Sequence, residues 1–167
     1  MGFNPSIRTE LTVVDDDRKW CRTTKGWNTT QTITLDMSTF TGDVFADGSG
    51  AVEGRVLHSG VPLGRITASG KYGPYDNDQT DGTEVLAGYL FSAVESDNDT
   101  FTSGTDMAAT LLWEGEVIQD RTPVHGLGVD NDPGFLDDTT RDAHTSIRFV
   151  QSSDLDEQGD SGLGYAV

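Results

Sequence analysis

The sequence holds one cysteine, Cys21, among its 167 residues. A single cysteine can form no disulfide within the chain and cannot take part in a zinc site built from several cysteines. No run of about 18 apolar residues occurs, and residues 1–20 lack the charged, apolar and cleavage regions of a signal peptide. We therefore expect a soluble chain that has no membrane partner and does not use that export route.

Basic residues are also scarce. Eleven lysines and arginines stand against 28 aspartates and glutamates, so the formal net charge is −17 at pH 7. Such a surface repels the phosphates of nucleic acids, and we expect no nucleic-acid partner. Aspartates outnumber glutamates by 21 to seven, and only three residues are lysine. This bias resembles proteins from salt-loving hosts, although an ordinary acidic surface gives the same composition.

Hydrophobic residues make up only 34% of the chain, and 20 residues are glycine. This composition favours short strands joined by many turns over long helices, so we predict a mainly β fold. The length suits one domain with peripheral extensions. The predicted organisation is an N-terminal arm at 1–30, a β domain at 31–150 and an acidic, flexible C-terminal tail at 151–167.

Alternating polarity predicts several of the strands. Residues 31–40 place Ile33 and Leu35 on one face and threonines on the other, which is typical of a half-buried strand. Residues 61–68 alternate too, but the phase changes at Gly64, which indicates a strand with a glycine bulge.

The second half of the chain offers further elements. Residues 85–94 form an almost unbroken apolar run, which we predict to be the central strand. Residues 108–118 predict a strand with Leu111 and Trp113 pointing inward. The best helix candidate is 135–144, followed by a last strand through Ile147 and Phe149.

The first 30 residues carry scattered apolar side chains without a helical period. An extended arm or an added strand is therefore predicted. Trp20 and Trp27 stand in polar surroundings, where large aromatic side chains cover a surface on their own domain or on a partner. Both outcomes remain open. The arm residues predicted to bind a partner are Phe3, Ile7, Leu11, Val13, Trp20 and Trp27.

One string has the form of an enzyme motif. Gly159-Asp160-Ser161-Gly162 resembles the sequence around the nucleophilic serine of chymotrypsin-like proteases. A catalytic triad also needs a base and backbone donors for the oxyanion. In this sequence only six residues follow Ser161. None of the histidines lies in a motif like the one that supplies the base in that protease family. We predict that the protein is not an enzyme and has no catalytic residue.

Other ligand sites are not indicated. The acidic loop at 76–82 has its glycine one position late for an EF-hand and lacks the closing glutamate. The three histidines are isolated in sequence from one another and from Cys21. No glycine-rich loop carries the lysine and hydroxyl residue that hold a phosphate. We predict no metal site and no cofactor.

A set of short pieces in the middle of the chain carries a family resemblance. They run between about Thr32 and Val150, and their order is more specific than any one of them. The core residues of this pattern are Gly64, Thr67, Gly70, Lys71, Tyr72, Pro74, Tyr75, Asp81, Gly82, Ala87 and Gly88. Together the pieces resemble the head decoration, or capsid stabilisation, proteins of tailed viruses, of the phage lambda type.

The resemblance implies a small single β domain of the lambda decoration-protein type, barrel- or tulip-like, with one short helix. It implies a homotrimer on the outer surface of the virion, at three-fold and quasi-three-fold positions of the head. The partners would be the major capsid protein and other copies of the chain. By bridging capsid subunits the trimer would stabilise the shell against the pressure of packaged DNA. The family's use of an N-terminal arm on the shell makes residues 1–30 the candidate anchor.

Two other classes stay open. One is a β-rich carbohydrate- or cell-surface-binding module on a virion, in which Trp20, Trp27 and Trp113 would provide stacking faces. The other is a hydrolase built on Ser161 or on the carboxylates.

Overall fold

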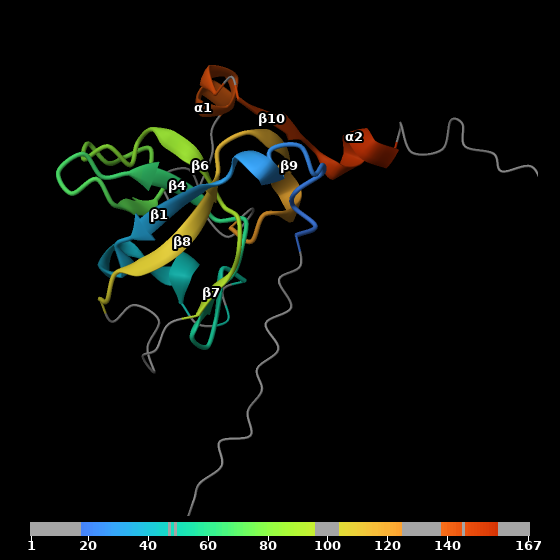
Figure 1. The fold of residues 1–167 in the computed structure, drawn as a ribbon. Coiled ribbons are helices and arrows are strands. Elements are labelled where there is room, and N and C mark those ends of the chain that lie inside the picture. The colour runs from blue at the N-terminus through green and yellow to red at the C-terminus, as the bar shows by residue number, and fades with distance from the viewer. Residues whose placement is uncertain are drawn as a thin grey trace, which may run out of the picture.

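A computed structural model describes residues 18–46, 48, 50–95, 104–124, 138–144 and 146–156 (Figure 1). The elements are mainly short strands, as predicted, together with 3-10 turns and two short helices. In chain order they are η1 (Trp27–Thr29), β1 (Gln31–Leu35), η2 (Met37–Thr39), η3 (Asp43–Phe45), β2 (Val52–Glu53), β3 (Val56–Leu57), β4 (Pro62–Arg65), β5 (Tyr72–Pro74), β6 (Leu86–Leu90), β7 (Val94–Glu95), β8 (Met107–Leu112), β9 (Gly115–Ile118), η4 (Gln119–Arg121), α1 (Asp138–Ala143), β10 (Ile147–Val150) and α2 (Ser152–Asp156). No helix in these described ranges is long and apolar enough to cross a bilayer.

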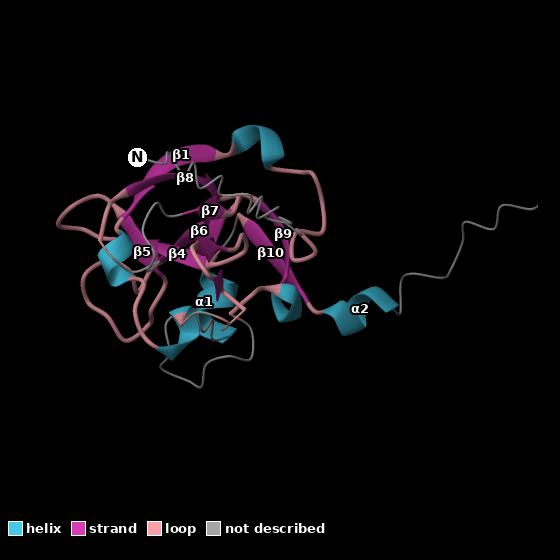
Figure 2. Cartoon of the chain, turned by 90° about the horizontal axis from the view of Figure 1, so that it is seen from below, coloured by secondary structure: helices cyan, strands magenta, loops and turns pink. Residues whose placement is uncertain are grey.

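Five strands close into a barrel in the order β1-β5-β4-β6-β8. Figure 2 shows these strands following one another around the domain. The longest pairing is antiparallel, between β1 and β8, and runs from Gln31 opposite Leu111 to Leu35 opposite Met107. Leu35 also pairs with Tyr72 of β5 in a parallel bridge, which closes the barrel. The barrel expected from the resemblance is confirmed.

Glycines set the closest approaches between barrel segments. The register between β4 and β6 shifts between Leu63 and Gly64, so the bulge predicted from the sequence is present. A Cβ on Gly64 would lie 2.5 Å from the Cα of Thr83. At Gly88, with φ of +154°, a Cβ would lie 2.3 Å from the carbonyl oxygen of Leu112. Both positions therefore require the absence of a side chain.

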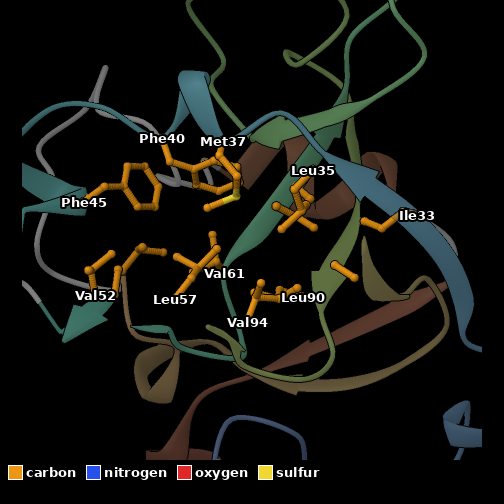
Figure 3. Close-up of a cluster of buried hydrophobic side chains, with 14 of the residues drawn as sticks. Ile33, Leu35, Met37, Phe40, Phe45, Val52, Leu57, Val61, Leu90 and Val94 are labelled. Carbon is orange, nitrogen blue, oxygen red and sulfur yellow. The ribbon is translucent and has the colours of Figure 1, made fainter. Parts of the chain in front are cut away.

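The main core fills the barrel and continues beyond one end of it (Figure 3). Ile33 and Leu35 point inward from β1, as their alternation predicts, and Leu90 of the apolar run is fully buried. At the far end Phe40 and Phe45 meet edge to face, with ring centroids 5.3 Å apart. The turns η2 and η3 thus cover that end with aromatic side chains.

A second core lies between the barrel and the strands β9 and β10. These two strands pair in parallel, from Ile147 opposite Gly115 to Val150 opposite Ile118. On the other side of β9, Cys21 forms an antiparallel bridge with Val117. The buried members of this core are Trp20, Tyr75, Leu86, Tyr89, Leu112, Val117 and Ile147. Cys21 and β10 are therefore brought to the two sides of β9, outside the barrel.

Four predictions of local structure need correction or qualification. The strand expected at 108–118 is interrupted, because the chain leaves the barrel after Leu112 and begins β9 at Gly115. Trp113 lies in that connection and is 39% exposed, so its predicted inward position is wrong. The predicted helix 135–144 is found as α1, while its first residues lie outside the described part. Within the predicted flexible tail the chain forms α2, which lies away from the barrel in both views (Figures 1 and 2).

Candidate functional site

The residues of the family pattern hold the barrel together. Thr67 donates its backbone N–H to the carbonyl of Asp81 at 2.7 Å, which ties the β4–β5 turn to the loop before β6. The Asp81 carboxylate accepts from the backbone N–H and the hydroxyl of Thr83, and these bonds lower the pKa of Asp81. A Cβ on Gly82 would lie 2.3 Å from the carbonyl oxygen of Arg65. This part of the pattern specifies packing between loops.

Other residues of the pattern make similar links. Lys71 lies between Asp106 at 2.7 Å and Asp36 at 3.8 Å. Its hydrogen bond to Asp106 is the main reason that the pKa of Lys71 is raised. The buried Tyr75 shares a hydrogen bond of 2.7 Å with the hydroxyl of Thr140, which fastens α1 to the barrel.

The remaining pattern residues also lie within the barrel. Tyr72 and Pro74 begin and end β5, Gly70 turns the chain ahead of it, and Ala87 lies in β6 beside Gly88. None of these placements gathers a reactive or ligand-binding group.

Trp20 is not available as a surface anchor. Its side chain is 1% exposed, its indole N–H donates to the hydroxyl of Ser59 at 3.1 Å, and its ring stacks on Tyr89. The prediction that Trp20 binds a partner is therefore wrong, since the indole is covered by its own domain. Trp20 and Cys21, which the sequence assigned to the arm, pack against the β domain, whereas residues 1–17 lie outside the described residues.

Trp27 remains at the surface, with 36% of its side chain exposed. Its indole N–H points to the sulfur of Cys21 at 3.3 Å, and its ring meets Phe91 edge to face at 5.5 Å between centroids. The guanidinium of Arg18 lies 4.2 Å from the Phe91 centroid and 5.5 Å from that of Trp27. A cation over aromatic faces is held by the ring quadrupole. Arg18, the first described residue, is thus held beside the partly exposed Trp27.

Trp113 extends the same region. Its indole N–H donates to the carbonyl of Thr29 at 2.5 Å, so it lies against η1. Gly26, before η1, approaches the carbonyl of Glu114 so closely that a Cβ would lie 1.9 Å from that oxygen. We call Arg18, Trp27, Phe91 and Trp113 the tryptophan surface. It presents two partly exposed indoles beside Arg18, the first described residue of the chain.

The other predicted partner-binding residues, Phe3, Ile7, Leu11 and Val13, lie outside the described residues, and so does the Gly159–Gly162 string with Ser161. Sequence analysis missed Arg18 and Phe91, because their contact joins positions far apart in the chain. The only indication of this contact in the sequence is that Arg18 lies close to the tryptophans of the same segment.

No ligand-binding cluster is seen in the described ranges. There, no three histidine, cysteine, aspartate or glutamate side chains are placed to hold a metal ion. His144 lies edge-on to Phe149, and its Nδ1 accepts the backbone N–H of Ile147 at 3.3 Å. Burial lowers the pKa of His144. Its contacts connect α1 to β10.

Comparison with known proteins gives one match. A family model described as the bacteriophage lambda head decoration protein D matches residues 33–119. The match begins within β1 and ends at the start of η4, so it includes part of β1 and all of the other four barrel strands. No curated protein and no solved structure matches the chain.

Proposed function

The chain belongs to the family of the bacteriophage lambda head decoration protein D, which lies on the outer surface of the phage capsid, and from this we propose that it binds the head as a trimer. The trimers would occupy three-fold and quasi-three-fold positions and contact the major capsid protein. This is a structural family and not an enzyme family, and we propose that the role of this chain is mechanical. Each bound trimer would add binding free energy at a junction between capsid subunits, so that expansion of the shell under the pressure of packaged DNA becomes less favourable.

The observation that carries this proposal is the coincidence of the family match with the barrel. The matched residues 33–119 contain the strands that close the barrel and the glycines that set their spacing. The residues of the family pattern are thus residues that pack the barrel. A rigid domain is what a mechanical bridge requires, because a flexible one would extend with the shell.

The tryptophan surface supports a particular orientation on the head. Arg18 contacts Phe91 and Trp27, so the tryptophan surface includes the first described residue after the proposed anchoring arm. We propose that this surface faces the shell together with the arm. Exposed tryptophan and arginine are the residue types that contribute most to binding at protein interfaces.

Binding to undecorated heads tests the proposal. The full chain should bind at stoichiometric copy number. Removal of residues 1–17 should leave a folded domain, because the cores begin at Trp20, but should lower the affinity at least about tenfold. Trp27→Ala should also weaken binding, by about tenfold.

The matched control is Val85→Ala, since Val85, at 66%, is the large exposed apolar residue of the described ranges that does not belong to the tryptophan surface. It should bind heads as the wild type does. A full-length protein that fails to bind purified heads would disprove the proposed function. Unchanged affinity of the truncated protein would remove the arm from it.

A glycan- or cell-surface-binding role remains as a second candidate because Trp27 and Trp113 are partly exposed. Trp20 no longer supports it. Specific binding of the isolated protein to a glycan, abolished by Trp113→Ala, would favour this alternative.

A further inference from the structure

The strand β10 has one edge that no other described strand covers. Among the described strands β10 pairs with β9 alone, and the other side of β9 is taken by Cys21 through its bridge to Val117 (Figure 1). The other free edges in the described sheets belong to β2 and β7, which have two residues each. With its four residues, β10 is therefore the longest free edge that the structure describes.

The hydrogen bonds between β9 and β10 show which backbone groups lie on this edge. Gly115 donates its N–H to the carbonyl of Ser146 at 3.2 Å, so the backbone of Gly115 faces β10. In the parallel register of the two strands, the backbone of Arg148 then faces β9, and the backbone of Phe149 faces the free side. The N–H and C=O of Phe149 are thus directed to the place where an added strand would lie.

Charged side chains alternate in sign across this small sheet. Arg22, Glu116 and Arg148 lie side by side on three neighbouring segments. The Glu116 carboxylate lies 3.7 Å from the guanidinium of Arg22 and 3.1 Å from that of Arg148. Arg148 stands at the free edge, with 69% of its side chain exposed. Because opposite charges on adjacent strands stabilise one another, the next position in this row, beside Arg148, suits a carboxylate.

We propose that the free edge of β10 binds an extended, acidic segment of the major capsid protein. The segment would bond to the backbone of Phe149 and place a carboxylate beside Arg148. A segment without an acid would cover Arg148 and leave its charge without a partner, so the edge discriminates against such segments. The proposal deepens the proposed function, on which it rests for the identity of the partner. It goes beyond the family match, because β10 lies outside residues 33–119.

Hydrogen exchange of the full chain, free and bound to undecorated heads, tests this inference at the backbone. The amide of Phe149 should exchange at least about tenfold more slowly on heads than in the free protein, because it gains a hydrogen bond to the added strand. Equally slow exchange in the free protein would overturn the inference, since another part of the chain or a second copy would then occupy the edge.

Arg148→Glu tests the charge. This substitution places two carboxylates against one another at the contact and should weaken binding to heads at least about tenfold. The matched control is Arg55→Glu, which should bind as the wild type does. Arg55 also lies 3.1 Å from one glutamate, Glu95, so both variants lose the same kind of ion pair and change the net charge equally. Thermal unfolding shows whether both variants are folded.

The outcomes separate this inference from the proposed function. Stoichiometric binding to heads without slower exchange at Phe149 would overturn the inference and leave the proposed function standing. A folded Arg148→Glu variant that binds heads as tightly as Arg55→Glu would do the same. A wild type that does not bind heads would disprove the proposed function, and the inference with it.

Discussion

Trp20 and Tyr89 stack with their ring centroids 5.7 Å apart and their planes inclined by 25°. Tyr89 belongs to the barrel strand β6, whereas Trp20 precedes the barrel and is covered by β9 and β10. The pair therefore joins the barrel to its second layer. Because Trp20 is among the largest fully buried side chains, it is the residue through which the N-terminal segment stabilises the domain.

Trp20→Ala should lower the free energy of unfolding by about 3–5 kcal/mol, because it removes a fully buried indole and leaves a cavity. Trp27→Ala should lower it by less than about 1.5 kcal/mol, since that ring is partly exposed and loses mainly its aromatic contact. Urea unfolding of the two variants measures the difference. Equal losses would show that Trp20 does not act as a core residue.

Gly60→Ala tests the packing around the same indole. Gly60 has φ of +91°, and a Cβ there would lie 2.7 Å from Cδ1 of Trp20 and 2.9 Å from Cδ of Pro123. The substitution should cost about 1–2 kcal/mol for the left-handed backbone and a further 1–3 kcal/mol for overpacking. Gly54→Ala is the control, because Gly54 has φ of +59° and a Cβ there would meet nothing within 4 Å.

Thermal unfolding of the two alanine variants separates backbone strain from steric overlap. Gly54→Ala should lose only the strain contribution. If both variants melt at the same temperature, the close approach of Gly60 to Trp20 is not present in solution.

His144 should make stability depend on pH near neutrality. Burial lowers the pKa of His144 below its ordinary value of 6.5, so the unfolded chain binds this proton more readily than the folded one. The stabilising contribution is complete above pH 6.5 and is lost as the pH falls through the lower folded-state pKa. Urea unfolding between pH 8 and pH 5 should show this decline.

His144→Gln should flatten that decline. The same substitution at His58, which lies 3.8 Å from Glu53 near the surface, should leave it in place. A decline that persists in His144→Gln would have to come from other titrating groups.

The sequence predicted those features that depend on neighbouring residues. Alternation placed Ile33 and Leu35 in the core, and the change of phase at Gly64 located the bulge. Closure of the barrel followed only from the family resemblance, because the bridge between Leu35 and Tyr72 leaves no local pattern.

The errors arose where distant segments decide the environment. Trp20 is buried by Val117 and Ile147, which follow it by about 100 and about 130 residues, and no property of residues 1–30 predicts this burial. Trp113 continues the alternation of β8, yet the chain turns away from the barrel there to begin β9, and the indole stays at the surface. The contact that holds Arg18 likewise depends on a residue distant in the sequence, Phe91.

Closure of the barrel has a consequence for a protein that coats a surface densely. Because β1 pairs with both β5 and β8, the barrel sheet has no free edge strand. Exposed edges allow one sheet to extend into the next and so permit open-ended aggregation. Edge strands remain only in the two small sheets of the described ranges, at β10 and at β2 and β7. A shell coated with this domain therefore offers no barrel edge onto which another copy could add a strand.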